Sequence, residues 1–508
     1  MKFKSLLLSL FLSLIVSNLI FAQNHSESLQ RLNQRIEETY QTFKPTGLSV
    51  AVIKDGKPVL MRSFGIRSQE TGEKATNQSL YNIASCTKPF TSAAIAMLVQ
   101  QGKVKWDDKV REYIPELKLG DPFITENLTI EDILSHRSGL ITFMGDLLWY
   151  QTDYTNEEII ERMEFLPIDN QFRADYGYQN NMFMIAGEIV ERVSGKTWSD
   201  FVQQEIFNPL EMSDSRPSND ELMEDDEIAY PHLKGRQVEL YDFNATKPAA
   251  SIMSNVNDLS HWVELVLNEG VYKGDTLLQP GMLTELMSPR TSFKVSKRQE
   301  ENGTQFRAYA LGWSVFDYYG VKVAEHNGGM PGYITKVSVV PGENLGVVVL
   351  NNGFDFFTHE VILHEVLDHY LKPGNEKDWI QLSQKQKENY TNYKENQRNA
   401  RLNSRISGTR PSLKKEQYTG KYKDQMYGKA TISIKERELF LTLEPAGDVF
   451  SAKMKHWHHD TYRVDFDDPF LPFGLITFRF NSRGEVESFK IDLPSNDFHF
   501  DNLKFSKI

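Results

Sequence analysis

The tetrapeptide SCTK at residues 85–88, followed directly by the apolar run PFTSAAIAMLVQ at residues 89–100, decides how the rest of this chain is interpreted. The second segment has the apolar spacing of a helix, whereas residues 79–84 are typical of a turn or an extended stretch. A helix that begins near Ser85 brings Lys88 onto the same face, because residues i and i+3 are neighbours on a helix. The sequence therefore predicts a hydroxyl and an amine side by side at a helix start, where the backbone amides favour negative charge.

This pair has a simple chemical interpretation. A serine hydroxyl becomes a strong nucleophile when a neighbouring base removes its proton. Lysine can serve as that base when burial lowers the pKa of its amine far enough to leave it neutral. A Ser-x-x-Lys pattern is common by chance, so the interpretation depends on partners elsewhere in the chain.

Two further groups of residues lie downstream, Tyr178-Gln179-Asn180 and His326-Asn327-Gly328-Gly329. Tyr178 and Asn180 stand two apart before a helical segment, and residues two apart in an extended stretch face the same way. A phenol can relay a proton to a leaving group, and an amide can hold both a lysine and a substrate carbonyl. The glycines after His326, which we expect to lead into a strand, would let a substrate approach the backbone closely.

In order and rough spacing, these three elements resemble the active-site motifs of the serine β-lactamase and penicillin-binding-protein superfamily, best known as S-x-x-K, S-D-N and K-T-G. The Tyr-x-Asn form of the second element resembles class C β-lactamases, DD-peptidases and the related esterases and D-aminopeptidases. The stretches ILSHRSGL at 133–140, NPLEM at 208–212 and LGW at 311–313 resemble the same branch.

The resemblance implies an α+β fold, in which the active site lies between an antiparallel sheet and a helical subdomain. It implies an acyl-enzyme hydrolase of esters or amides in small or peptide-like substrates, with a β-lactamase or DD-carboxypeptidase as the alternative. The amides of Ser85 and Gly329 would form the oxyanion hole. The site residues that it implies are Ser85, Lys88 and Tyr178 for catalysis, and Asn180, His326, Gly328 and Gly329 for substrate or oxyanion binding.

His326 departs from the resemblance, because the lactamases usually carry lysine at this place. Histidine is charged only below a pKa near neutrality, so we expect it to help little in binding a substrate carboxylate unless acid pH protonates it. We therefore expect weak β-lactamase activity and better turnover of neutral esters or peptide-like substrates. A non-catalytic protein that binds cell-wall material or peptides is the alternative from another class, and the combined presence of Ser85, Lys88, Tyr178 and Asn180 favours the enzyme.

Composition narrows the function further. The formal net charge of −12 over 508 residues gives no reason to expect a nucleic-acid partner. Cys86 is the single cysteine, which excludes a disulfide within the chain, and we interpret it as a buried packing residue. His364 and His369 are five apart, off one helix face, and the run HWHH at 456–459 divides between two faces of a strand. We therefore expect neither a metal nor a cofactor.

The first residues, MKFK, and the apolar run that follows to residue 21 are typical of a secretory signal peptide ending at Ala22. An uncleaved membrane anchor is the alternative, because the run approaches the length of a bilayer span. We expect cleavage and export to the periplasm or the medium, with no stable membrane insertion afterwards.

The remaining chain divides into three expected parts. These are a hydrolase domain over residues 23–375, a polar helical linker over 376–412, and an antiparallel β domain over 413–508. Short alternating runs, such as Leu439, Leu441 and Leu443, predict a small barrel or curled sheet. It resembles the lipocalin-like domain often appended to this hydrolase family. Either it narrows the mouth of the active site, or it is a passive stabilising module. The oligomeric state stays open.

Overall fold

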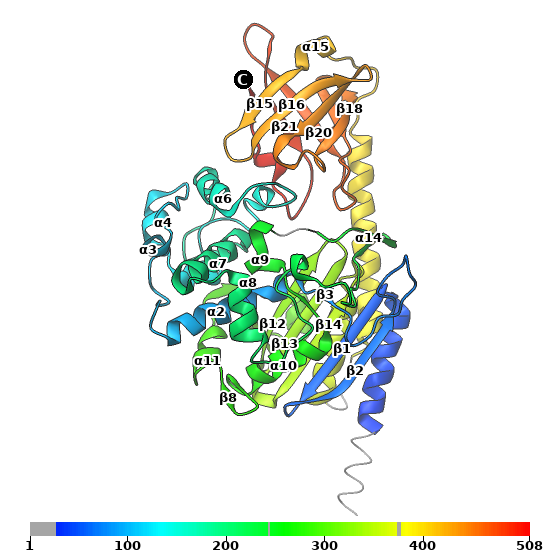
Figure 1. Ribbon diagram of the computed structural model, residues 1–508. Helices are drawn as coiled ribbons and strands as arrows, with labels where there is room; N and C mark the ends of the chain where they lie inside the picture. Colours follow the sequence, from blue (N-terminus) through cyan, green and yellow to red (C-terminus); the bar gives the residue numbers. More distant parts are fainter. Residues whose placement is uncertain (1–26, 242–243, 373–376) are drawn as a thin grey trace, which may run out of the picture.

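The computed structural model describes residues 27–241, 244–372 and 377–508, and it shows a mixed helix-and-sheet body with a β barrel above it (Figure 1). The predicted α+β class and the all-β unit that follows are both confirmed. The predicted signal peptide, residues 1–22, lies outside the described residues. Within the described ranges no helix has the length and apolar character needed to cross a bilayer.

The body is built on an eight-stranded sheet in the order β2-β1-β14-β13-β12-β11-β10-β9. All neighbouring pairs are antiparallel. The pair Asp55-Gly56, which is typical of two-residue hairpins, forms the turn between β1 and β2, and both residues have the positive φ (53° and 69°) that such a turn requires. The strands are β1 (Gly47–Lys54), β2 (Lys57–Gly65), β9 (Thr291–Phe293), β10 (Arg307–Tyr309), β11 (Ser314–Tyr318), β12 (Val321–Met330), β13 (Tyr333–Val340) and β14 (Leu345–Asn351).

Alternating side chains bury the sheet on both faces. Val50 and Val349 face residues of the N-terminal helix (27–43) and of α13 (Thr358–Leu371), whereas Ala51 and Val348 face the opposite layer of helices. Each fully buried aliphatic side chain of this kind stabilises the fold by about 1.5–3 kcal/mol. The helices of the body include α2 (Lys88–Gln100), α4 (Pro122–Asn127), α5 (Ile130–Leu134), α6 (Asn156–Arg162), α7 (Asn180–Ser194), α8 (Trp198–Val202), α9 (Lys247–Ala250), α10 (Val256–Leu267) and α13 (Thr358–Leu371).

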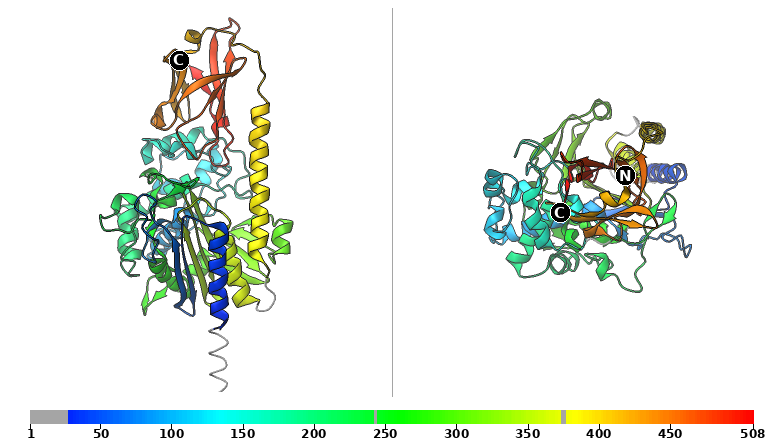
Figure 2. Two further views of the ribbon diagram at one scale, coloured as in Figure 1. Left: turned by 90° about the vertical axis from the view of Figure 1, so that its right-hand side faces the viewer. Right: turned by 90° about the horizontal axis from the view of Figure 1, so that it is seen from above.

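A 25-residue helix, α14 (Trp379–Asn403), runs along the side of the body up to the barrel (Figure 2). Its buried residues, Trp379, Ile380 and Ser383, lie near its start. The remaining helix is solvated, as the polar sequence predicts. The exact limits of the three expected parts stay predictions.

The C-terminal strands close into an eight-stranded barrel whose interior is filled with aromatic rings. Phe489 stacks on Phe505 with ring centroids 4.8 Å apart, and Tyr422 packs edge-on against Phe489. The closed barrel is thus confirmed, while its likeness to lipocalins stays a prediction. The strands are β15 (Gly420–Asp424), β16 (Gly428–Lys435), β17 (Glu438–Leu443), β18 (Ser451–His458), β19 (Thr461–Val464), β20 (Gly474–Phe480), β21 (Val486–Asp492) and β22 (Phe505–Lys507).

The barrel docks firmly on the body. The Tyr150 hydroxyl donates to Asp468 Oδ2 (2.8 Å), and its ring lies 4.2 Å from that of Phe498. His499 Nε2 lies 2.8 Å from the Thr142 carbonyl oxygen. A polar linker by itself would fit two loosely joined units, yet the apolar core of the body continues into the barrel.

Candidate active site

Ser85 lies in a short 3-10 turn, η1 (Ala84–Thr87), between β3 (Tyr81–Asn82) and α2. Ala84 has a φ of +48°, in the left-handed region that costs a non-glycine residue about 1–3 kcal/mol. Its backbone N–H donates to Asn82 Oδ1 (2.6 Å), which helps to hold the turn. Strain of this kind is typical of functional sites, and here it immediately precedes Ser85.

The turn is fastened to the sheet. The Cys86 thiol donates to the His326 carbonyl (3.1 Å), and Thr335 Oγ1 donates to the Ile83 carbonyl (2.7 Å). Burial raises the pKa of the Cys86 thiol to about 12, in keeping with a packing residue.

Gly328 serves this packing. A Cβ at Gly328 would lie 2.2 Å from the Ile83 carbonyl oxygen and 2.1 Å from Thr335 Oγ1. The sequence predicted that Gly328 gives space to a substrate. The structure corrects this, because the space is taken by the turn that carries Ser85. Gly329, in contrast, lines the cavity beside Ser85.

Lys88 is the first residue of α2 and is completely buried. Its Nζ lies 3.1 Å from Ser85 Oγ and donates to Asn180 Oδ1 (2.7 Å) and to the Ala249 carbonyl (3.0 Å). These partners are neutral. Burial lowers the pKa of Lys88 to about 7, although the nearby Asp146 carboxyl opposes the shift. A substantial fraction of Lys88 is therefore neutral near pH 7, with a lone pair free to accept a proton.

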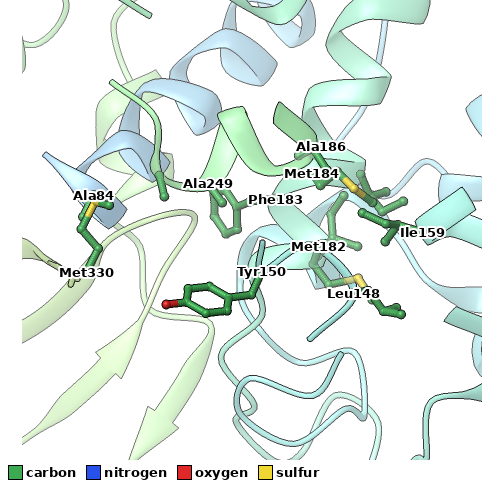
Figure 3. Packing of buried hydrophobic residues seen from close by; sticks show 14 of the residues in the cluster. Ala84, Leu148, Tyr150, Ile159, Met182, Phe183, Met184, Ala186, Ala249 and Met330 are labelled. Atoms are coloured by element: carbon green, nitrogen blue, oxygen red, sulfur yellow. The ribbon is translucent and has the colours of Figure 1, made fainter. Parts of the chain in front are cut away.

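Asn180, at the start of α7, connects Lys88 to Asp146. Its Nδ2 donates to Asp146 Oδ2 (2.7 Å). Burial raises the pKa of Asp146 to about 7, while the hydrogen bond from Asn180 lowers it. Behind this chain, Met182 and Met184 of α7 pack into the apolar cluster that also contains Leu148 (Figure 3).

Tyr178 lies over Lys88, whose Nζ is 4.7 Å from the centre of its ring. Burial raises the pKa of Tyr178 well above its usual value, and a hydrogen bond with Ser85 acts in the opposite direction. The neutral phenol is thus in contact with the proposed nucleophile. The His136 ring packs against Tyr178 with centroids 4.3 Å apart, and His136 Nδ1 accepts from the Gln179 backbone N–H (3.1 Å).

His326 is buried and lies within β12, not before a strand as the sequence suggested. Its Nδ1 lies 2.8 Å from the Asn327 carbonyl and its Nε2 lies 2.8 Å from the Tyr309 hydroxyl. The carbonyl can only accept, so Nδ1 carries the proton and Nε2 accepts from Tyr309. Burial, helped by the charge of Lys88, lowers the pKa of His326 to about 3.

This pKa agrees with the neutral imidazole that the sequence predicts. We also expected acid pH to protonate His326 and so help it bind a carboxylate, but with this pKa His326 stays neutral well below pH 5. The segment His326–Met330 pairs with β13 on one side, whereas β11 pairs only with Val321–Glu325. The other edge of this segment therefore pairs with no strand among the described residues. A backbone N–H of β12 on that edge can donate to an oxyanion beside Ser85 only if no strand occupies it.

Ser85 opens into a cavity of about 480 Å³, within the usual range for small-molecule sites. Its wall is mostly aromatic, and most of its rings come from the body: Phe143, Trp149, Tyr150, Tyr176, Tyr178, Phe293, Tyr309, Phe354 and Phe356. Phe470, Asp497 and Phe498 of the barrel complete the wall. The barrel therefore contributes to the cavity wall, which favours the first of the two roles left open by the sequence.

Several residues of this site were not predicted. His136 lies in the ILSHRSGL stretch, whose likeness to the family was the available signal. Asp146, Tyr309 and the barrel residues carry no local motif, because folding alone brings them to Ser85. In the described parts of the chain no three His, Cys, Asp or Glu side chains gather as a metal ion would require.

The family model for Beta-lactamase matches residues 32–370, and the chain belongs to this family. Residues 404–507 match a second family, described as a domain of unknown function (DUF3471).

Named relatives are similar over the same region. An unguisins hydrolase of Aspergillus campestris is 28% identical over 334 residues, covering 62% of this chain and 60% of the relative. An unguisins hydrolase of Aspergillus violaceofuscus is 27% identical, covering 68% and 66%. The protein flp of Staphylococcus aureus is 26% identical, covering 67% and 66%. The chain thus spans about two thirds or less of the length of these relatives.

Among solved structures, the octameric penicillin-binding protein homologue from Pyrococcus abyssi has a TM-score of 0.60 with this chain. The two are 20% identical, and the likeness covers 94% of this chain and 100% of that one. At this level of sequence identity, the structural likeness is evidence for the fold alone.

Proposed function

We propose that this protein is a serine hydrolase that acts through an acyl-enzyme formed on Ser85. The contact of Lys88 Nζ with Ser85 Oγ, at 3.1 Å, carries the proposal. A buried amine held by neutral oxygens beside a serine hydroxyl is a competent general base near pH 7. The relatives that are named hydrolases support the same class of reaction.

In the proposed mechanism, Ser85 Oγ attacks the substrate carbonyl carbon while neutral Lys88 accepts its proton. The oxyanion that develops accepts hydrogen bonds from the backbone N–H groups of Ser85 and Gly329. Tyr178 passes a proton to the leaving group as the scissile bond breaks. Water then attacks the acyl-enzyme with the same groups acting in reverse, which frees Ser85.

The cavity supports peptide-like esters or amides as substrates. Its aromatic wall, with Phe293 and Phe356 among the lining rings, favours an apolar substituent. His326 provides no positive charge for a β-lactam carboxylate, because its pKa is about 3. The basic and apolar N-terminal sequence supports export, so substrates outside the cytoplasm are proposed as well.

Covalent labelling tests the proposal. A fluorophosphonate probe should label the protein at Ser85, as read by mass mapping of the adduct, and Ser85→Ala should abolish both labelling and ester hydrolysis. Ser314, which also lines the cavity, provides the matched control, because Ser314→Ala should still be labelled at Ser85. A probe adduct at another residue, or full turnover by folded Ser85→Ala, would contradict the assignment.

A further inference from the structure

His136 is a completely buried residue whose conformation breaks a local rule of helix ends. Helix α5 ends at Leu134, Ser135 follows as its C-cap, and His136 then has a φ of +56°. Glycine or asparagine usually occupies this left-handed position after a helix, because other side chains cost free energy there. A histidine held in a strained conformation beside a candidate active site indicates that its side chain has a function.

Two hydrogen bonds join His136 to the segment that carries Tyr178. The His136 carbonyl accepts from the Gly177 backbone N–H (2.9 Å), and His136 Nδ1 accepts from the Gln179 backbone N–H (3.1 Å). These two amides belong to the residues on either side of Tyr178. His136 therefore holds the backbone before and after the residue whose phenol is hydrogen-bonded to Ser85.

The bond from Gln179 also fixes the state of the imidazole. Because Nδ1 accepts from a backbone N–H, the proton of the neutral ring is on Nε2. Burial, helped by the charge of Lys88, lowers the pKa of His136 well below its usual value, so the ring stays neutral. Nε2 has no hydrogen-bond partner among the described residues. The hydrogen bond that this side chain contributes is thus the one at Nδ1.

The ring of His136 packs against rings of the site. Its centroid lies 4.3 Å from that of Tyr178 and 4.5 Å from that of Tyr309, and Phe183 of α7 lies at 5.3 Å. Tyr178 and Tyr309 line the cavity, and His136 supports them from behind. One residue therefore holds both the backbone and the ring of Tyr178.

We propose that His136 is a positioning residue, which holds Tyr178 through the bond at Nδ1 so that the phenol can pass a proton to the leaving group. This inference rests on the proposed hydrolase function. It gives His136 no contact with the substrate. Substrates whose leaving group needs a proton should therefore depend on His136, whereas substrates with a stable anionic leaving group should not.

Two esters with the same acyl group test the proposal on the full-length protein. Acetyl-phenylalanine methyl ester releases methoxide, which needs a proton, whereas the p-nitrophenyl ester releases a stable phenolate. The ratio of their kcat/KM values, methyl over p-nitrophenyl, does not depend on the folded fraction, because both rates come from one preparation. His136→Gln should lower this ratio roughly tenfold, since a misplaced proton donor loses much of its effect. His136→Ala, which also lacks an acceptor at this place, should do the same.

His136→Asn is the conservative variant. Its Oδ1 lies near the place of Nδ1 and can accept from Gln179, and asparagine tolerates a positive φ. It should leave the ratio close to that of the unchanged protein. His459 provides the matched control, because it is an exposed barrel residue with a φ of +43°. His459→Gln and His459→Asn should both leave the ratio unchanged.

A double variant shows whether His136 acts through Tyr178. Tyr178→Phe removes the hydroxyl and should lower the ratio on the order of 10²-fold. Adding His136→Gln should lower it no further, because the proton donor is already absent. A further fall in the double variant, an unchanged ratio in His136→Gln, or equal losses in His136→Gln and His136→Asn would each overturn the proposal.

Hydrogen exchange keeps this inference separate from the proposed function. Measured by mass spectrometry, a peptide that covers residues 177–179 should exchange faster in His136→Gln and at the original rate in His136→Asn, whether or not any ester is hydrolysed. If the unchanged protein hydrolyses neither ester, the hydrolase proposal fails, and exchange still decides whether His136 holds this segment. If exchange is the same in all three proteins while both esters are hydrolysed, the inference alone fails.

Discussion

Among the residues that the structure describes, two lysines are completely buried, Lys336 and Lys88, and they differ in the charge of their neighbours. Lys336 on β13 forms ion pairs with Glu325 (2.8 Å) and Glu360 (2.9 Å). Burial would lower the pKa of Lys336, yet the two carboxylates outweigh it and raise that pKa. Lys88 has only neutral oxygens in direct contact, and its pKa falls to about 7.

The difference teaches that burial alone does not make a lysine a neutral base that can accept a proton. Lys336 is locked in the charged form and serves the structure. Lys88 is held by groups that stabilise it in either form, since an amide, a carbonyl and a hydroxyl impose no net charge. The nearest carboxyl to act on it, Asp146, is separated from it by Asn180. Burial lowers the pKa of Lys88, and Asp146, at this distance, opposes the shift without reversing it.

The largest expected effect comes from removing each amine. Lys88→Met should reduce kcat/KM on the order of 10³-fold without unfolding the protein, because the general base is lost. Lys336→Met should instead lower the free energy of unfolding by about 3–5 kcal/mol, since two carboxylates lose their buried partner. Urea unfolding and ester hydrolysis of both variants measure the contrast. If folded Lys88→Met and folded Lys336→Met lost activity to a similar extent, the contrast between the two lysines would be wrong.

Asn180→Asp should make the surroundings of Lys88 resemble those of Lys336. A carboxylate in contact with Nζ raises the pKa of Lys88, so the neutral base is scarce at pH 7 and the rise of kcat/KM with pH moves to higher pH. The loss at pH 7 should be roughly tenfold or more. A pH profile of ester hydrolysis checks this. Asn180→Ala adds no charge, so its profile should not move to higher pH even if its rate falls.

The smallest effect should come from Asp146→Asn. In the unchanged protein, kcat/KM should rise as pH increases through about 7, because Lys88 acts when it has lost its proton. The Asp146 carboxyl favours protonated Lys88, so its removal should move this rise to lower pH. Asp220→Asn, at a residue paired with Lys247 on the surface, is the control with an unchanged profile. An upward move in Asp146→Asn would contradict the assigned role.

The sequence predicted what depends on local pattern. The hairpin at Asp55-Gly56, the helix after Ser85 and the alternating strands of the barrel follow from turn chemistry and periodicity. The grouping of Ser85, Lys88, Tyr178 and Asn180 followed from ordered motifs.

The remaining features depend on tertiary contact. Gly328 has the residue type expected of a substrate-facing glycine, yet its missing Cβ accommodates the Ile83 carbonyl. Arg307 and Asp497 stand in no motif, and only the assembled sheet of the body and the docked barrel bring them to the cavity. The polarity of the linker concealed the aromatic contacts of Tyr150 with the barrel, because those contacts come from loops far along the chain.

The two barrel loops at the cavity, around Phe470 and Phe498, have a consequence for how the sequences of proteins with this architecture diverge. They belong to the barrel, whose strands pack around aromatic rings such as Phe489 and Phe505. Heritable variation in these loops can therefore accumulate without disturbing the strained turn before Ser85 or the partners of Lys88. In a protein with this architecture, variation in one unit can change what the cavity accepts while the residues around Ser85 stay unchanged in the other.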